Sequence, residues 1–257
     1  MFALIGDSPV WQVFWYALLT AVATGLGAIP FAFIKKQSPS IMGVSNALAA
    51  GLMLGASFGL IYEGIEYHLA KTVLGVIAGL VFIYLTHKVL ERFEGMHHFE
   101  GEIFAGLKQG SLKKAVLIVL IMTVHSAAEG IGIGTSFGGG MTFGLIMSLA
   151  IAVHNIPEGL AISAVLTSRG MPWWKAALWS IFTSLPQPLM AVPAFLFIQA
   201  FKPLLPVGLG FAAGAMLWLT LSEIVPDAYE DIKPEKTALV TVFSLILMVA
   251  FQVYLGD

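Results

Sequence analysis

Two short motifs with the same spacing of histidine and glutamate carry the clearest chemistry in this sequence. The first contains His125 and Glu129, and the second contains His154 and Glu158. Residues four apart lie one turn apart on the same face of an α-helix, so each pair can point into one site. Two neutral imidazoles and two carboxylates make a ligand set whose charge a divalent cation balances. We therefore predict a metal site built from these four side chains.

The segments that carry both motifs are strongly apolar. Of the 257 residues, 58% are hydrophobic and only 11% are charged, and the mean hydropathy is +0.89. A soluble domain carries about a quarter charged residues, so the composition predicts an all-α membrane protein. A stretch of about 20 apolar residues crosses a hydrocarbon core about 30 Å thick. Eight such stretches are predicted as transmembrane helices: 10–34, 41–62, 69–87, 115–137, 142–166, 173–200, 204–225 and 237–255.

Eight helices nearly fill the chain, so we expect residues 1–257 to form a single eight-span transmembrane domain. Eleven lysines and arginines follow the odd-numbered spans, whereas the opposite side holds only Lys71 and Lys202. Because cytosolic loops are enriched in these residues, we predict both termini outside the cytosol and a cytosolic loop at about 88–114. The expected location is the cell (plasma) membrane. The expected partners are the lipid bilayer and divalent metal ions, with no nucleic acid, and a homodimer is an open alternative to a monomer.

Two internal repeats suggest how the helices are arranged. The fourth and fifth spans share the pattern V-H-x-x-x-E-G-[IL]-x-I, and residues 49–54 resemble residues 212–217 in spans of opposite direction. Inverted repeats are typical of secondary transporters, whose sites lie near the membrane midplane. We therefore predict a 3+2+3 arrangement, in which spans 1–3 and 6–8 are inverted-repeat halves around the central pair. Coincidence is the alternative for the second repeat, because helix interfaces favour Gly and Ala.

The buried histidines and glutamates have a purely structural interpretation as well. Ionisable groups at bilayer depth cost a few kcal/mol each, and an ion pair on each helix could simply hold the helices together. The duplication, with Gly130 and Gly159 directly after the glutamates, favours a site. Pro157 frees a backbone carbonyl near Val153, although transmembrane prolines are often only tolerated.

The two motifs also resemble those of a known family. His154 begins the hexapeptide H-N-I-P-E-G, and His125 begins H-S-A-A-E-G, which together are similar to the ZIP (Zrt/Irt-like) metal transporters. The resemblance implies a divalent metal transporter that moves Zn²⁺, or Fe²⁺, Mn²⁺ or Cd²⁺, into the cytosol while a transport bundle slides against a scaffold. It implies His125, Glu129, His154 and Glu158 as the primary ligands and Ser57 as a supplementary one.

The resemblance further implies residues around a second metal and at the inner exit. Additional ligands of a second ion would be Ser126, Asn155 and Gln187, the last in L-P-Q-P-L where the family has glutamate. Ser126 stands where relatives often have asparagine, and both departures weaken ligation. One ion with a weaker neighbouring site is therefore the preferred interpretation. Glu223 resembles an acidic position near the inner exit.

Transport has one competitor from another functional class, an intramembrane metal-dependent hydrolase. Such an enzyme needs an open metal position for water and commonly a separate general base. The H-E-x-x-H signature is absent, and the duplicated ligand set is typical of a carrier rather than an enzyme. We therefore expect a transporter and no enzyme activity. A third alternative, a membrane scaffold, leaves the carboxylates without a purpose. Histidines and glutamates of the loop after the third span could relay the metal or form an ordinary hydrophilic connector.

Overall fold

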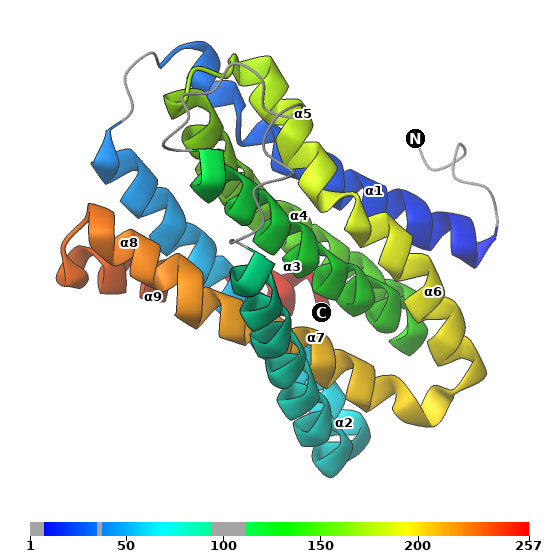
Figure 1. The fold of residues 1–257 in the computed structure, drawn as a ribbon. Coiled ribbons are helices and arrows are strands. Elements are labelled where there is room, and N and C mark those ends of the chain that lie inside the picture. The colour runs from blue at the N-terminus through cyan, green and yellow to red at the C-terminus, as the bar shows by residue number, and fades with distance from the viewer. Residues whose placement is uncertain (1–7, 35–37, 94–111, 257) are drawn as a thin grey trace.

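The computed structural model of the chain describes residues 8–34, 38–93 and 112–256. Within these ranges the protein is helical and contains no strand, which confirms the all-α prediction (Figure 1). Two 3₁₀ turns cover Ile29–Ala32 and Lys202–Leu204. The α-helices are α1 (Pro9–Leu26), α2 (Pro39–Phe93), α3 (Leu112–Gly139), α4 (Met141–Ser168), α5 (Trp173–Ser184), α6 (Pro186–Ala200), α7 (Leu205–Leu219), α8 (Val225–Asp231) and α9 (Pro234–Gly256).

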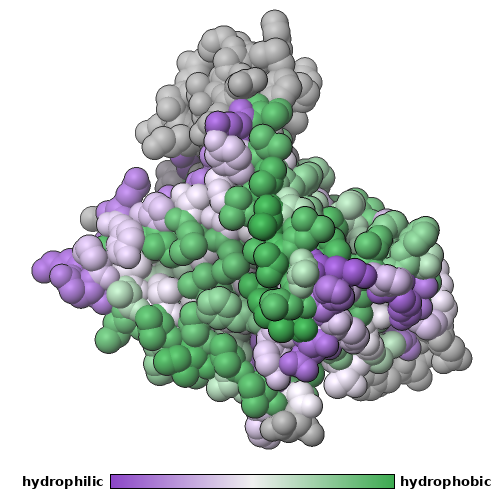
Figure 2. Space-filling view, turned by 90° about the horizontal axis from the view of Figure 1, so that it is seen from below, coloured by the Kyte–Doolittle hydropathy of each residue, from purple (hydrophilic) through white to green (hydrophobic). Residues whose placement is uncertain are grey.

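Most of these helices have the length and composition of membrane spans. In the described part of the chain, six helical segments of 23 to 51 residues are long and apolar enough to cross a bilayer. Side chains on the outer faces are apolar too: on α9, Leu239, Val242, Phe243 and Ile246 are each more than half exposed. Figure 2 shows broad hydrophobic areas, with hydrophilic residues gathered in separate patches at the left edge and right of the centre. The chain is a multi-pass membrane protein.

The second and third predicted spans are joined more tightly than expected. We predicted a connection between residues 62 and 69, but α2 continues to a kink at His68, whose backbone is extended (φ −171°, ψ 104°). The Lys71 N–H donates to His68 Nδ1 at 3.4 Å, and the Thr72 hydroxyl donates to the His68 carbonyl at 3.1 Å. His68 thus caps the second arm of α2, which removes the need for a loop.

The sixth and seventh predicted spans are interrupted. Residues 173–200 form α5 and α6, which meet at Leu185, because Pro186 lacks the N–H that a continuous helix requires. The seventh span runs beyond its predicted end at residue 225. It passes through a π-helical turn at Thr220–Ile224 and ends with α8 at Asp231. The predicted loop at about 88–114, with its histidines and glutamates, lies largely outside the described residues.

Close backbone contacts at glycines divide the helices into two groups. The α2/α7 group contains α2, α7, α8 and α9. In it, a Cβ on Gly79 would lie 2.0 Å from the Phe211 carbonyl oxygen, and a Cβ on Gly51 would lie 2.1 Å from the Thr241 carbonyl oxygen. Only glycine permits helices to approach so closely.

The α3/α4 group contains α1 and α3 to α6, and it is packed in the same manner. A Cβ on Gly134 of α3 would lie 2.0 Å from the Ala191 carbonyl oxygen of α6. Between the two groups, side chains rather than backbones meet: a Cβ on Gly132 would lie 3.0 Å from the Ala212 Cβ. In Figure 1, α1 and α3 to α6 run alongside one another, while α2, α7, α8 and α9 lie to their left and below them.

Candidate metal centre

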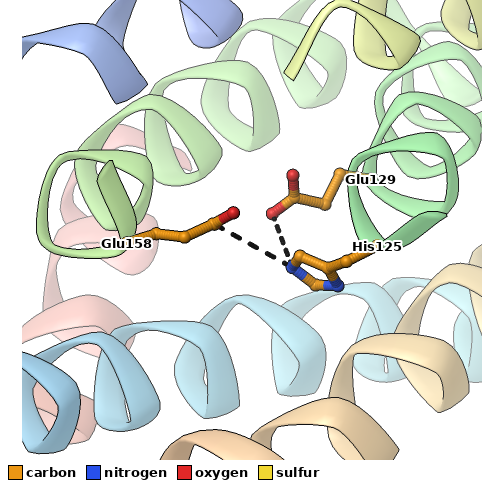
Figure 3. A group of neighbouring side chains, drawn as sticks. All are labelled: His125, Glu129 and Glu158. Carbon is orange, nitrogen blue, oxygen red and sulfur yellow. Dashed lines mark ion pairs between the residues drawn. The ribbon is translucent and has the colours of Figure 1, made fainter. Parts of the chain in front are cut away.

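Three of the four predicted ligands converge at one point between α3 and α4. The ligand atoms of His125, Glu129 and Glu158 all lie within 4.8 Å of one another, and Figure 3 shows the side chains pointing toward each other. His125 Nε2 is 3.2 Å from Glu129 Oε1 and 4.0 Å from Glu158 Oε2. All three residues are at most 3% exposed. Two carboxylates and an imidazole therefore share one buried pocket.

The fourth predicted ligand, His154, approaches this triad through a single member. Its Nε2 atom is 2.6 Å from Glu129 Oε1, within hydrogen-bond distance, but His154 does not belong to the set that lies within 4.8 Å. The duplicated motif therefore does not produce a symmetric square of ligands. Glu129 Oε1 is the central atom, because it faces both His125 and His154.

Several atoms of this cluster have unused hydrogen-bonding capacity. Both oxygens of Glu158 and both ring nitrogens of His125 are buried without a hydrogen-bond partner among the described residues. Buried polar atoms are normally paired, and a buried carboxylate without compensation costs several kcal/mol. Oxygen and imidazole donors together suit Zn²⁺ and other divalent transition metals. The donor set thus fits a divalent cation.

The glycine after each glutamate has a clear structural role. A Cβ on Gly130 would lie 2.5 Å from the Gln187 carbonyl oxygen, and a Cβ on Gly159 would lie 1.7 Å from the Thr24 carbonyl oxygen. Each glycine therefore lets a neighbouring helix, α6 or α1, pack directly beside a candidate ligand. This packing fixes the backbone from which Glu129 and Glu158 extend.

The residues expected around a second metal also lie beside Glu129. Gln187 Nε2 donates to Glu129 Oε2, and Asn155 Nδ2 donates to Gln187 Oε1 at 3.3 Å. Ser126 is fully buried, and its hydroxyl has no partner among the described residues. Thr20 of α1 joins this network through a hydrogen bond to Gln187 Oε1. Sequence reasoning missed Thr20, because a threonine in an apolar span carries no spacing signal.

Ser57 and Glu223 are placed differently from the triad. Ser57 is buried in α2, where its hydroxyl donates to the Met53 carbonyl at 2.8 Å. Glu223 lies in the π-helical turn, and its Oε1 is 3.6 Å from His87 Nε2. His87, the last residue of the predicted third span, belongs to α2, where its ring forms an edge-to-face pair with Trp218 at 5.3 Å between centroids.

A small crevice has two histidines in its lining, one from each group of helices. These are His125 of α3 and His87 of α2, and Thr86 lines the crevice as well. Val124 and Leu219 contribute apolar walls. The crevice lies where α3 faces α2 and α7, which is the boundary between the two groups of helices.

Comparison with known proteins agrees with these features. The profile described as ZIP zinc transporter matches residues 105–251. A putative zinc transporter of Arabidopsis thaliana is 47% identical over 92% of this chain, which spans 38% of that protein's length. The zinc transporter GufA of Myxococcus xanthus is 29% identical over 93% of this chain and 97% of its own length. The zinc transporter ZupT of Chlorobaculum parvum is 30% identical, over 83% and 86% respectively. The chain belongs to the ZIP zinc transporter family.

Proposed function

We propose that this protein carries divalent metal ions, with Zn²⁺ as the main substrate, across the membrane and into the cytosol. His125, Glu129, His154 and Glu158 hold the ion during its passage. The observation that carries the proposal is the buried triad within a multi-pass member of the ZIP family. A metal site with this donor set at this depth serves a cation that must leave water and later return to it.

The measured separations are compatible with a four-coordinate ion. Ligand atoms about 2.0–2.2 Å from a tetrahedral Zn²⁺ are roughly 3.3–3.6 Å apart. His125 Nε2 and Glu129 Oε1, at 3.2 Å, are already close to this spacing. Glu158 Oε2, at 4.0 Å from His125 Nε2, needs a small approach, and His154 supplies the fourth donor when its ring turns from Glu129 toward the ion. The two carboxylates balance the charge of the cation.

The positions of the helix connections support eight crossings with both termini on one side. Lys71 Nζ donates to the Pro203 carbonyl at 2.9 Å, and Lys202 Nζ donates to the Gly138 carbonyl at 3.0 Å. The α2 kink, the α3–α4 turn and the α6–α7 connection therefore lie at one end of the molecule. We assign this end to the outside and both termini to the same side. We also assign the protein to the plasma membrane.

Matched glycines support the inverted-repeat arrangement. Gly51, in the span-2 arm of α2, packs on the Thr241 carbonyl of α9. Gly214, its counterpart in the repeat, packs on the Val76 carbonyl in the span-3 arm of α2. If span 2 is exchanged with span 7 and span 3 with span 8, the first contact becomes the second. This is the relation expected of 3+2+3 topology.

The boundary between the two groups provides a route for release. The α3/α4 group carries the ligands, and a shift of this group against the α2/α7 group moves the ion along the crevice that His87 lines. Glu223, beside His87, then receives the ion at the cytosolic exit. Ser57, Ser126 and Asn155 are proposed as weaker contacts along this route.

Zinc uptake by proteoliposomes tests the proposal. Purified wild-type protein should give saturable ⁶⁵Zn²⁺ uptake, and Glu158→Gln should reduce it at least about 100-fold, since a neutral amide no longer balances the cation. Protein-free vesicles and a size-exclusion profile of the variant serve as controls. Folded wild-type protein that binds zinc but transports none would contradict transport and favour a metal-dependent hydrolase.

A further inference from the structure

Gln187 is placed so that it controls one oxygen of Glu129. The residue is fully buried near the start of α6, and its Nε2 donates to Glu129 Oε2. The other oxygen, Oε1, faces His125 Nε2 at 3.2 Å and His154 Nε2 at 2.6 Å. The two oxygens of a single carboxylate therefore have separate partners, an amide on one side and two imidazoles on the other.

The orientation of the Gln187 amide follows from its neighbours. A carboxylate oxygen only accepts, so the amide nitrogen must face Glu129. The amide oxygen then meets donors on its other side: Asn155 Nδ2 at 3.3 Å and the Thr20 hydroxyl at 2.5 Å. Asn155 Nδ2 also donates to the Thr20 carbonyl at 2.9 Å, which fixes the second amide as well. A reversed Gln187 amide would oppose oxygen to oxygen at Glu129.

The backbone holds this network in place. Gly130 directly follows Glu129, and a Cβ there would lie 2.5 Å from the Gln187 carbonyl oxygen and 2.8 Å from its Cα. The start of α6 thus rests on α3 at the candidate ligand itself. Three helices, α1, α4 and α6, contribute to the orientation of one carboxylate on α3.

We propose that Gln187 is a positioning residue that makes Glu129 a one-oxygen ligand and takes the place of a second cation. The inference rests on the proposed function of the His/Glu site. An N–H directed at Oε2 places its partial positive charge where a second, bridging ion would have to bind. Ser126 Oγ and Asn155 Oδ1 are buried and unpartnered among the described residues, but these two neutral oxygens supply no charge to retain a second divalent ion. The site therefore holds one ion.

Two substitutions at one position test the proposal in the purified full-length chain. Zinc per chain is measured after equilibrium dialysis, affinity by competition with a chelator, and geometry from the visible absorption of bound Co²⁺. Wild-type protein should bind one ion. Gln187→Leu should still bind one, with about 10- to 100-fold lower affinity, as for other losses of a ligand's supporting hydrogen bond. Its Co²⁺ bands should change, because Glu129 becomes free to chelate through both oxygens. Gln187→Glu should bind two ions, since it sets a second carboxylate against Glu129.

Thr20→Val provides a milder variant if the Gln187 variants do not fold. It removes one of the two donors to Gln187 Oε1, so the affinity should fall in the same direction by a few-fold. Two ions in the wild type, one of them lost in Gln187→Leu, would identify Gln187 as a ligand and overturn the proposal. Unchanged affinity and Co²⁺ bands in Gln187→Leu or Thr20→Val would overturn it too. Glu129→Gln distinguishes a failure of the Gln187 proposal from a failure of the proposed metal site. Wild-type zinc affinity in Glu129→Gln would reject the metal site itself.

Discussion

The two groups of helices bury polar side chains in different ways. In the α3/α4 group, polar side chains bond across helices: the Thr24 and Ser184 hydroxyls are 2.8 Å apart, and Ser163 and Ser180 are 3.0 Å apart. In the α2/α7 group, the buried hydroxyls mostly return to their own helix. Ser57, for example, donates to the carbonyl four residues earlier.

This difference suggests separate tasks for the two groups. Directional bonds between helices fix relative positions, which ligands of a metal require. Glycine-mediated contacts hold the α2/α7 group closely without such bonds. Where the groups meet, apolar side chains such as Leu60, Met147 and Leu209 share one cluster. An apolar boundary has few bonds to break, which suits the proposed shift of one group against the other.

The largest effect is expected from a disulfide that links the two groups across their boundary and prevents relative movement. The chain contains no cysteine, so an introduced pair has no native competitor. Cβ atoms at Gly132 and Ala212 would be 3.0 Å apart, shorter than the about 3.5–4.5 Å of a disulfide, so a small separation of the two helices would let the bond form. Oxidation of Gly132→Cys/Ala212→Cys should abolish zinc uptake, and a reductant should restore it.

A pair within one group provides the matched control. Gly43 and Asp231 belong to the α2/α7 group, and a Cβ on Gly43 would lie 2.7 Å from the Asp231 Cβ. Gly43→Cys/Asp231→Cys should transport zinc equally well when oxidised or reduced. Full uptake by the oxidised boundary pair would show that the groups need not move relative to one another.

Glycine substitutions should show that packing is tighter within a group than at the boundary, through their effects on stability. Gly159→Ala places a methyl group 1.7 Å from a backbone oxygen of α1, so α4 and α1 would have to move apart. We expect the free energy of unfolding to fall by about 3 kcal/mol or more. Gly132→Ala meets a side chain at 3.0 Å across the boundary and should change stability by about 1 kcal/mol or less. Thermal denaturation in detergent compares the two, and equal losses would argue against a looser boundary.

The smallest effect is expected at the proposed exit. Glu223→Gln should lower the rate of zinc uptake several-fold, because Glu223 contacts His87 outside the triad. Equilibrium zinc binding should be unchanged, since the triad is intact. Loss of binding in this variant would place Glu223 in the primary site instead.

The sequence could predict the helical character and the clustering of His125, Glu129 and Glu158, because the apolar stretches and the repeated motif are local patterns. Four-residue spacing alone puts His125 beside Glu129. The different placements of His125 and His154 could not be predicted, because helix packing sets the offset between α3 and α4. The glycines that follow Glu129 and Glu158 were the available signal for that packing.

Other features had no local signature. Gly64, four residues before His68, packs against Thr72 beyond the kink, but a glycine at that distance does not predict a kink at His68. Pro226 lacks the N–H that an α-helix would direct at the Ser222 carbonyl, but a proline alone does not predict the π-helical turn that presents Glu223. Thr20 contributes only through its contact with Gln187, which joins α1 to a residue far along the chain.

The most direct test compares the two histidines that border the crevice, one from each group. Zinc binding and uptake are measured on the same preparations of His125→Ala and His87→Ala. We predict that His125→Ala loses both high-affinity binding and saturable uptake, whereas His87→Ala binds zinc normally and transports it more slowly. Normal uptake by His125→Ala, or loss of binding in His87→Ala alone, would contradict a route through the triad.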